Sequence, residues 1–466
     1  MPFIRPAYAL CALSLFAIAS HAQTTTPAVS TVLAFNISNP YGNLVRAADG
    51  VLYGVAAPAT AVAGGIVYRS AIDGSNVKTI YQLTPDDAYT PQGGLLIGSD
   101  GLLYGTTKYG RAGEANSTGT IFRLSTAGTG FTVLHRFQAS AAANSDFSVI
   151  NTDGALPEAE LIEGTDGYLY GVTRAGGPNG RGAIFKMAKD GTGFAVLHTF
   201  AANTATTVGQ VVNADGAHPV GQLVQGADGY FYGTTSTGGT NGNGTIFRIA
   251  FDGAGFQVLR QFSATAIDAD TGFAENADGA TPLAGLTNGN DGLLYGVTSS
   301  GGTNGLGVIF SMTPDGSTYT VMHTFDGPDG AVPSGELLLG SDGKLYGATS
   351  AGGVNSNGET TAFGTIFSID RAGTGFARLY SLDGSAGNTP TTRLLEISSG
   401  RFIGTASAGG RCGYGTIFNF SAAGDKVDGN TRCGNNNNNN DNGGGSTGVG
   451  LLVLLGGLAW ARRRLR

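Results

Sequence analysis

Short apolar runs separated by glycine-rich turns recur along almost the whole chain. One clear copy, residues 221–262, holds the runs "GQLVQG", "YFYGTTS", "GTIFRIA" and "FQVLRQF". Asp228-Gly229 separates the first run from the second, and Asp252-Gly253 separates the third from the fourth. Asp-Gly between apolar runs is typical of a β-hairpin, because the turn requires positive φ. Each copy is therefore predicted to be a four-stranded antiparallel unit.

Two anchors set the number of copies. A tripeptide ending in Tyr-Gly centres on Tyr53, Tyr104, Tyr170, Tyr232, Tyr295 and Tyr346, and Ile403 takes the tyrosine's place in a seventh copy. The pattern Pro-x-x-x-Leu precedes it every time, from Pro40–Leu44 to Pro390–Leu394. Seven units of four strands predict an all-β fold, a seven-bladed β-propeller. We expect the tyrosines to pack in the core and the glycine after each to let neighbouring blades approach.

The predicted propeller occupies residues 23–424. Its units lie near residues 40–84, 91–137, 157–200, 219–262, 282–325, 333–382 and 390–420. The seventh unit has three runs and then stops, whereas "STVLAFN" (Ser30–Asn36) stands alone before the first unit and resembles the fourth run of the others. We expect residues 31–36 to complete blade 7 beside Gly415–Phe420, which would cover an open sheet edge.

Both chain ends differ from the repeat. Residues 1–22 combine one arginine, an apolar run and a small-x-small site, the pattern of a secretory signal peptide cut by signal peptidase after Ala22. A buried N-terminal helix is the alternative. At the other end, an Asn-rich linker (residues 425–442) precedes an uncharged apolar stretch (residues 447–461) and four arginines. That stretch is short for a membrane span, and the arginines are expected to stay cytoplasmic.

Composition narrows the function. The two ends hold five of the 26 basic residues and none of the 33 acidic ones, so the mature chain is acidic. An acidic surface argues against nucleic-acid binding, which needs basic patches. Cys412 and Cys433 are the cysteines left after export, and in an oxidising compartment we expect them to pair, with two free thiols as the alternative.

Two groups of side chains are candidates for ligand binding. The residue before the repeated leucine is polar and varied, and we expect four such residues to ring the mouth of the channel: Glu160, Gln222, Glu336 and Arg393. Three adjacent long loops between blades form the second group, and they lead to Asp153, Asp215 and Asp278. The polarity of a water-filled channel and solvated spacer loops are the alternatives.

No catalytic or metal-binding pattern is evident in the sequence. His135, His198 and His323 occupy one column of the repeat, on outer strands too far apart to share a metal. No cofactor is expected, and the alternative left open is a structural calcium ion among Asp268, Asp270 and Asp278.

The repeat unit resembles the GloVer tandem repeat of bacterial surface proteins. The resemblance rests on wording such as "DGLLYGTTKYG" and "GTIFRLSTAGTGFTVLHRF" within Asp100–Phe137, and it covers about residues 31–420. That family combines the repeat with different surface anchors. The resemblance implies export and surface anchoring but brings no established activity.

The tail resembles the GlyGly-CTERM sorting signal of Gram-negative bacteria. The matching features are Gly443, Gly444, Gly445 and Ser446, the short apolar segment and the basic end. The resemblance implies cleavage near the glycines by a rhombosortase-type intramembrane protease, and display at the cell surface or release after type II secretion. The alternative is a plain C-terminal anchor in the inner membrane.

These features favour a binding protein over an enzyme. We expect an exported, surface-anchored or surface-released propeller that binds an extracellular glycan or protein. An exported carbohydrate-active hydrolase or lyase is the first alternative; it would use Glu160 and Glu336, which lie in blades expected to be nearly opposite across the channel. A structural spacer of the envelope is the second.

Overall fold

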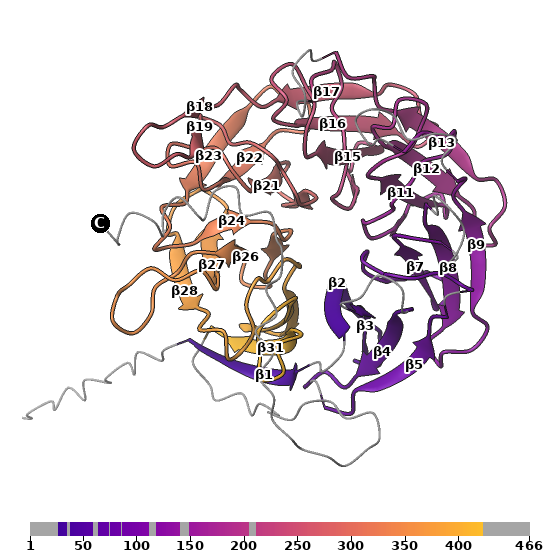
Figure 1. Cartoon of the computed structure of the whole chain (residues 1–466), viewed down its shortest axis with the longest axis horizontal. Coiled ribbons are helices and arrows are strands. Elements are labelled where there is room, and N and C mark those ends of the chain that lie inside the picture. Colours follow the sequence, from indigo (N-terminus) through magenta and orange to yellow (C-terminus); the bar gives the residue numbers. More distant parts are fainter. Residues whose placement is uncertain are drawn as a thin grey trace, which may run out of the picture.

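The computed structural model describes residues 27–34, 38–58, 64–73, 75–84, 86–110, 118–139, 149–204 and 211–422. Their strands form seven antiparallel sheets arranged as blades around a central channel (Figure 1). The predicted all-β, seven-bladed propeller is confirmed. The part of the chain that the structure describes contains no helix of the length and apolar character needed to cross a membrane.

In blades 2 to 5 one short inner strand lies inside three longer strands, whereas the inner strand of blade 1, β2 (Ser38–Arg46), has nine residues. Blades 1 to 3 contain β2 (Ser38–Arg46), β3 (Leu52–Pro58), β4 (Ile66–Ser70), β5 (Lys78–Gln82), β6 (Leu96–Ile97), β7 (Leu102–Thr107), β8 (Thr120–Ser125), β9 (Thr132–Arg136), β10 (Ile162–Glu163), β11 (Leu169–Thr173), β12 (Ala183–Met187) and β13 (Ala195–Thr199). Blades 4 and 5 contain β14 (Val224–Gln225), β15 (Tyr230–Thr235), β16 (Thr245–Ala250), β17 (Gln257–Gln261), β20 (Thr287–Asn288), β21 (Leu294–Thr298), β22 (Val308–Met312) and β23 (Tyr319–Thr324).

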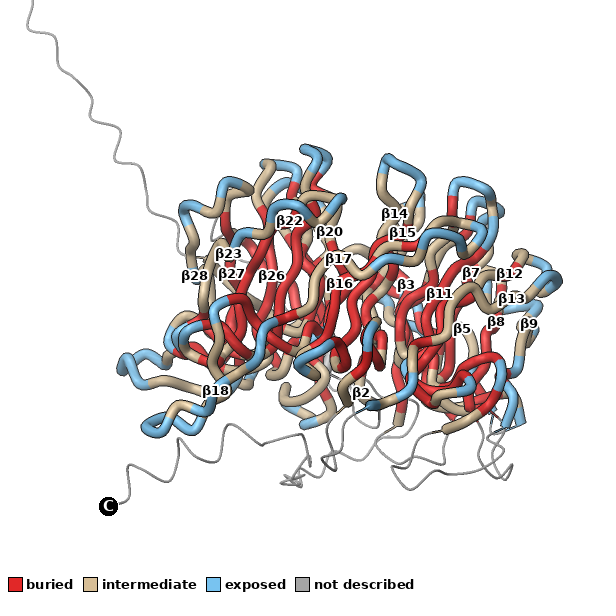
Figure 2. The backbone as a smooth tube through the Cα atoms, turned by 90° about the horizontal axis from the view of Figure 1, so that it is seen from above, coloured by how far each residue is buried: buried red, intermediate tan, exposed pale blue. Residues whose placement is uncertain are grey.

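The last two blades vary this plan. Blade 6 contains β24 (Ala331–Pro333), β25 (Leu338–Leu339), β26 (Lys344–Ala351), β27 (Thr365–Asp370) and β28 (Ala377–Ser381), and blade 7 contains β29 (Leu395–Ser398), β30 (Arg401–Ala406) and β31 (Thr416–Ser421). In blade 6 both β24 and β25 pair with β26, so they are two pieces of one inner strand. A small hairpin of β18 (Ala266–Ile267) and β19 (Ala274–Glu275) projects from the loop between blades 4 and 5 (Figure 2).

The ring is closed by the N-terminal strand, as predicted. β1 (Ala28–Ala34) pairs antiparallel with β31, from Ala28 opposite Ser421 to Ala34 opposite Thr416. The two strands lie side by side at the outer edge of blade 7 (Figure 1). The strand starts at Ala28, before the expected residue 31, because its pairing continues to the C-terminal end of β31.

The hydrophobic core is divided into layers between neighbouring blades. Seven clusters of buried residues are present in the described ranges, and each joins two adjacent blades. In the third strand, consecutive side chains such as Ile246 and Phe247 are both fully buried. They point to opposite faces of the sheet, where Ile246 belongs to the cluster shared with blade 5 and Phe247 to the cluster shared with blade 3.

The tyrosines of the repeated tripeptide belong to these layers. Tyr170 is fully buried and its hydroxyl donates to Asp166 in the hairpin turn at 2.6 Å. The same hydroxyl lies 3.2 Å from the carbonyl of Phe251 in the next blade. Tyr104 and Tyr295 make the same pair of contacts with their own turn and the next blade. The expected core role of the tyrosines is confirmed, and they also tie the blades together.

The glycine after each tyrosine makes room within its own blade. A Cβ atom on Gly171 would lie 2.5 Å from Cζ of Phe185 and 2.8 Å from Cδ2 of Leu161. Phe185 is the cross-strand partner of Gly171 in β12, so its ring covers the glycine. The expectation that this glycine lets neighbouring blades approach was wrong, because the atoms it accommodates belong to the same blade.

Candidate functional site in the central channel

Each inner strand bulges away from the second strand and so faces the channel. In blade 3, Ala155 pairs with Ala175 and Ile162 pairs with Tyr170. Seven steps along the inner strand therefore oppose five along its neighbour, which leaves two extra residues, the pattern of an enlarged β-bulge. The Pro-x-x-x-Leu segment fills this bulge. We name its three variable positions the outer, middle and inner position in chain order.

A strained residue fixes the start of the bulge. The residue before the proline has a positive φ of 54–60° in six copies: Thr90, Leu156, His218, Thr281, Val332 and Thr389. This backbone region is unfavourable for side chains of this size. Two backbone hydrogen bonds hold it in blade 3, where Leu156 donates to the carbonyl of Thr118 at 2.8 Å and accepts from the amide of Arg174 at 3.1 Å.

The middle position is small because it contacts the next blade. A Cβ atom on Gly93 would lie 2.5 Å from the carbonyl oxygen of Ala159, and one on Gly221 would lie 2.2 Å from the amide nitrogen of Gly285. The inner and outer positions are left to face the channel. Alternation along an extended chain thus divides the segment between blade packing and channel lining.

A cavity of about 440 Å³ lies in the channel, and all seven blades contribute to its wall. Its lining comes mainly from the three variable positions, and it includes Glu160, Gln222 and Glu336. A volume of this size is typical of sites for small molecules. Three of the four predicted channel residues therefore line one cavity, and the fourth, Arg393, contacts Glu336 at its edge.

The inner positions form a polar ring around the floor of the cavity. Asn43 donates from Nδ2 to Oε2 of Glu160 at 2.9 Å and accepts from the backbone amide of Arg393 at 2.8 Å. Nη1 of Arg393 lies 3.4 Å from Oε2 of Glu336. Gln222 donates from Nε2 to the carbonyl of Leu161 at 3.1 Å. The contacts link blades 1, 3, 4, 6 and 7 across the channel.

The two glutamates of this ring are buried and interact electrostatically. Glu160 is 7 % exposed and Glu336 is 8 % exposed. Burial raises the pKa of Glu160 to about 7, opposed by Arg393 and supported by the negative charge of Glu336. Burial also raises the pKa of Glu336, opposed by Arg393. Both carboxyls therefore share one environment, although their blades are not neighbours in the ring.

Glycine at two inner positions gives these carboxyls their space. A Cβ atom on Gly94 would lie 2.8 Å from Oε2 of Glu160, and one on Gly285 would lie 2.5 Å from Oε1 of Glu336. Each glutamate side chain extends over the glycine of the preceding blade. A side chain at either glycine would displace a carboxylate.

The outer positions vary as much as the inner ones, but sequence reasoning missed them. They place Tyr41, Val220 and Leu283 on the cavity wall, and Leu283 is 37 % exposed. Glu158 lies on the same wall, where Nζ of Lys108 and Nη1 of Arg174 approach it at 2.7 Å and 3.4 Å. The Pro-x-x-x-Leu spacing contained the signal, but the bulge that turns this position toward the channel was not foreseen.

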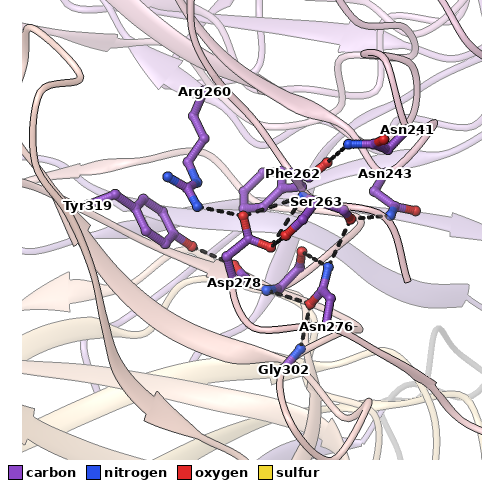
Figure 3. Close-up of polar contacts among 10 residues, drawn as sticks. Asn241, Asn243, Arg260, Phe262, Ser263, Asn276, Asp278, Gly302 and Tyr319 are labelled. Atoms are coloured by element: carbon purple, nitrogen blue, oxygen red, sulfur yellow. Dashed lines mark hydrogen bonds and ion pairs between the residues drawn. The ribbon is translucent and has the colours of Figure 1, made fainter. Parts of the chain in front are cut away.

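The predicted loop aspartates lie away from the cavity, in the loops that follow the outer strands. Asp278 accepts from Nη2 of Arg260 at 2.5 Å and from the hydroxyl of Ser263 (Figure 3). The Arg260 guanidinium lies 3.7 Å from the ring centre of Tyr319, which belongs to the next blade. Asn276 bonds the carbonyls of Ser263 and Gly279, so the loop is closed on itself. We name this arrangement the outer clasp.

The outer clasp recurs in three other blades with histidine in place of arginine. Its Nε2–Oδ2 contacts are His135–Asp153 at 3.1 Å, His198–Asp215 at 2.9 Å and His323–Asp329 at 2.6 Å. The histidine rings stack on Phe194, Phe256 and Phe376 of the following blades. Asp153, Asp215 and Asp278 therefore lie apart from the cavity and are occupied by contacts between elements of the scaffold.

The remaining predicted site residues are not brought together. Asp268 accepts from the amides of Asp270 and Thr271 within the β18–β19 hairpin, whereas Asp278 belongs to the outer clasp. Within the described ranges no three His, Cys, Asp or Glu side chains are grouped to hold a metal ion. Cys433, Ala22, the linker, Gly443 to Ser446 and the apolar stretch 447–461 lie outside the described residues. The pairing of Cys412 with Cys433 stays a prediction.

Similarity to solved structures concerns the fold alone. The GH74 enzyme of Niastella koreensis has a TM-score of 0.50 and 14% identity, over 81% of this chain and 52% of that one. An oligogalacturonate lyase in complex with manganese has a TM-score of 0.47 and 9% identity, over 85% and 96%. A nidogen/laminin complex gives 0.39 and 16%, over 70% and 90%.

Sequence comparison is more decisive about the family. No curated protein is significantly similar to this chain. The Gloeobacter/Verrucomicrobia repeat, in contrast, matches in three overlapping segments, residues 14–201, 143–275 and 270–360. These segments cover well over half of the chain and contain the anchors of the first six units. The chain therefore belongs to the Gloeobacter/Verrucomicrobia repeat family.

Proposed function

We propose that this protein is an exported, non-catalytic propeller that binds an extracellular ligand in its central cavity. One observation carries the proposal: side chains vary in chemistry at the outer and inner positions, where the flanking proline and leucine are constant. These positions line a cavity of about 440 Å³. A rigid scaffold with variable residues around one cavity is typical of a binding site. The cavity size favours a glycan unit or a side chain over a broad protein surface.

The proposed location rests on the two chain ends. We propose export by signal peptidase after Ala22, an Asn-rich linker at 425–442 and a sorting tail at 443–466, processed by a rhombosortase-type protease for type II secretion. Trp460 is the only tryptophan and lies beyond the glycines. Protein released from the native host should therefore show no tryptophan fluorescence. A clear tryptophan signal in the released form contradicts cleavage at the glycines.

Binding is tested by a polysaccharide panel with the secreted mature chain. We expect at least one glycan to bind, and substitution at an outer position, Leu283→Lys, to weaken it about tenfold or more, because a charge would enter the apolar wall. Lys344→Ser is a matched control, since its ion pair with Asp370 is exposed and remote from the cavity wall. A panel without any binder overturns the proposed function and leaves the spacer alternative.

A second candidate function is carbohydrate cleavage, and the glutamate pair favours it. Glu160 and Glu336 interact in one cavity, and the pKa of Glu160 is raised to about 7. Such a carboxyl is suited to act as a general acid beside a second carboxylate. The same panel, scored for reducing ends and for unsaturated products, distinguishes the two functions. Products that disappear in both Glu160→Gln and Glu336→Gln would establish the enzyme.

A further inference from the structure

We propose that the floor of the cavity binds an ammonium group, and that the ligand is an amino sugar within a glycan. This inference rests on the proposed binding function and specifies its ligand class. It follows from the balance of charges in the inner ring, the shape of the wall above it and the number of acceptors available.

The inner ring holds two carboxylates and one cation. Arg393 pairs with Glu336, whereas the hydrogen-bond donor to Glu160 is the neutral amide of Asn43. Arg393 also interacts with Glu160 electrostatically, so one cation is shared by two buried carboxylates, which is unfavourable because burial disfavours the charged form. A cation bound beside Glu160 offsets this cost. The floor therefore selects for positive charge.

The acceptors of the floor suit an ammonium group better than a metal ion. An ammonium group donates three hydrogen bonds. Glu160 accepts from Asn43, and Glu336 accepts from Arg393 and from the backbone amides of Gln222 and Gly285, so the two carboxylates together still offer more acceptor sites than these partners use. A calcium ion takes six to eight oxygen ligands. The described residues provide no group of three acidic or histidine side chains.

The wall above the floor suits a sugar ring. Tyr41, Val220 and Leu283 present apolar surface, and Ser334 and Thr391 lie on the same wall. A sugar ring has apolar C–H faces and a polar hydroxyl edge, so it matches a wall of this mixed character. The cations Lys108 and Arg174 beside Glu158 do not strongly oppose entry of a cationic ligand. Both contact the Glu158 carboxylate, which neutralises part of their charge, and the Arg174 side chain is 46% exposed, so solvent screens it.

The test compares two ligands that differ only in the group at nitrogen, a free amine in one and an uncharged acetamide in the other. Calorimetric titration near pH 7 of the secreted mature chain uses a β-1,4 tetramer of glucosamine and the corresponding tetramer of N-acetylglucosamine. We expect the charged tetramer to bind about tenfold more tightly or better, the scale of one charge-assisted hydrogen bond. Equal binding of the two tetramers overturns the inference but leaves the proposed function standing. If other glycans bind and neither tetramer does, the inference also falls.

Two substitutions with opposite expected effects on the affinity for the charged tetramer distinguish charge recognition from misfolding. Glu160→Gln keeps the acceptor for Asn43 and should abolish the preference for the charged tetramer. Arg393→Gln removes the internal cation and should tighten binding of the charged tetramer. Glu163→Gln is the matched control, because Glu163 lies on β10 but bonds Ser99 and Lys189 away from the cavity, and it should leave binding unchanged.

A third ligand tests the source of the ammonium group. Nα-acetyl-lysine amide carries an ammonium group on an alkyl chain without a sugar ring. Weak binding of this ligand beside tight binding of the charged tetramer supports the assignment to a glycan. Binding as tight as that of the tetramer would keep the ammonium site and overturn the amino sugar as its ligand.

Discussion

At the scale of single residues, the floor of the cavity combines burial with charge. Glu160 accepts a hydrogen bond from Asn43, interacts with Glu336 and Arg393, and remains almost entirely buried. A position that served only to fill space would be served as well by an apolar side chain. The cost of burying the Glu160 carboxylate should therefore appear as a pH dependence of the free energy of unfolding.

The pH dependence of unfolding should report this cost. Burial raises the pKa of Glu160 from 4.5 to about 7, so between these values the unfolded chain releases its proton first. The contribution of Glu160 to the free energy of unfolding is fully present below pH 4.5 and is lost as the pH rises through about 7. We expect Glu160→Gln to raise the free energy of unfolding at pH 8 relative to wild type, by on the order of 1–3 kcal/mol.

Urea denaturation of both proteins at pH 5 and pH 8 checks this expectation. The difference between variant and wild type should be larger at pH 8 than at pH 5. Glu163→Gln is the control, because the pKa of Glu163 is lowered by Lys189 and Ser99 against the effect of burial. If the free energies of unfolding of Glu160→Gln and wild type differ by the same amount at pH 5 and at pH 8, the proposed ionisation is contradicted.

At the scale of elements, the outer clasp explains why histidine and aspartate recur together. The fourth strand ends beside the loop to the next blade, and the His198 ring lies between Asp215 of that loop and Phe256 of the following blade. One side chain thus joins a strand, a loop and a neighbouring blade. The clasp fixes the entry to the bulged segment without taking part in the cavity.

Loss of the His198–Asp215 contact should destabilise the loop that leads into the bulged inner strand. We expect His198→Ala to lower the free energy of unfolding by about 1 kcal/mol, through loss of the hydrogen bond with Asp215 and of the ring contact with Phe256. A double-mutant cycle with Asp215→Ala should give a positive coupling energy, because the two side chains contact each other. Equal binding of the panel ligand by His198→Ala and wild type is expected as well. Additive effects in the cycle would mean that the pair contributes nothing.

Sequence patterns predicted the blades well, because strand, turn and repeat signals all act locally. Asp-Gly turns and the Pro-x-x-x-Leu anchor fixed seven units, and the lone N-terminal run identified the closing strand. Glu160, Gln222, Glu336 and Arg393 were also grouped correctly around one channel. Glu160 and Glu336 come from blades that are not neighbours, yet their carboxyls interact, since the geometry of the floor depends on how far each side chain extends over a neighbouring glycine.

The loop aspartates show the limit of such reasoning. The length of three adjacent loops suggested binding, whereas Asp153, Asp215 and Asp278 each contact a His or Arg side chain about 18 positions earlier in the chain. A column of His or Arg and a column of Asp were both visible in the sequence. Their pairing was missed because a fourth strand and the following loop meet only once the blade is folded.

At the scale of the whole molecule, stability depends on the last contact in the ring. Each blade buries its two faces against its neighbours, and blade 7 receives its outer strand from the opposite end of the chain. Without β1, the outer edge of β31 would present unpaired backbone groups, which promotes association with other chains. Closure of the ring therefore depends on both the first and the last strand of the propeller.

Removal of residues 28–34 tests closure directly. We expect the shortened chain to unfold at a temperature several degrees lower and to form dimers or larger aggregates, because the free edge of β31 can pair with another chain. Size-exclusion chromatography with light scattering and thermal unfolding measure both effects. A synthetic peptide of residues 28–34 added in trans should restore the monomer, whereas a scrambled peptide should not. A shortened chain as stable and monomeric as the full one contradicts this account.

The closing strand also has a consequence for how such genes can change in length. The first six repeat copies each form one blade, whereas blade 7 combines the two ends of the repeat region, since β1 supplies its fourth strand. Duplication or loss of one whole copy therefore leaves the same two ends to meet, with three strands at one and the missing strand at the other. The ring could gain or lose a blade by unequal recombination within the repeat and still close through the same pairing of first and last strands.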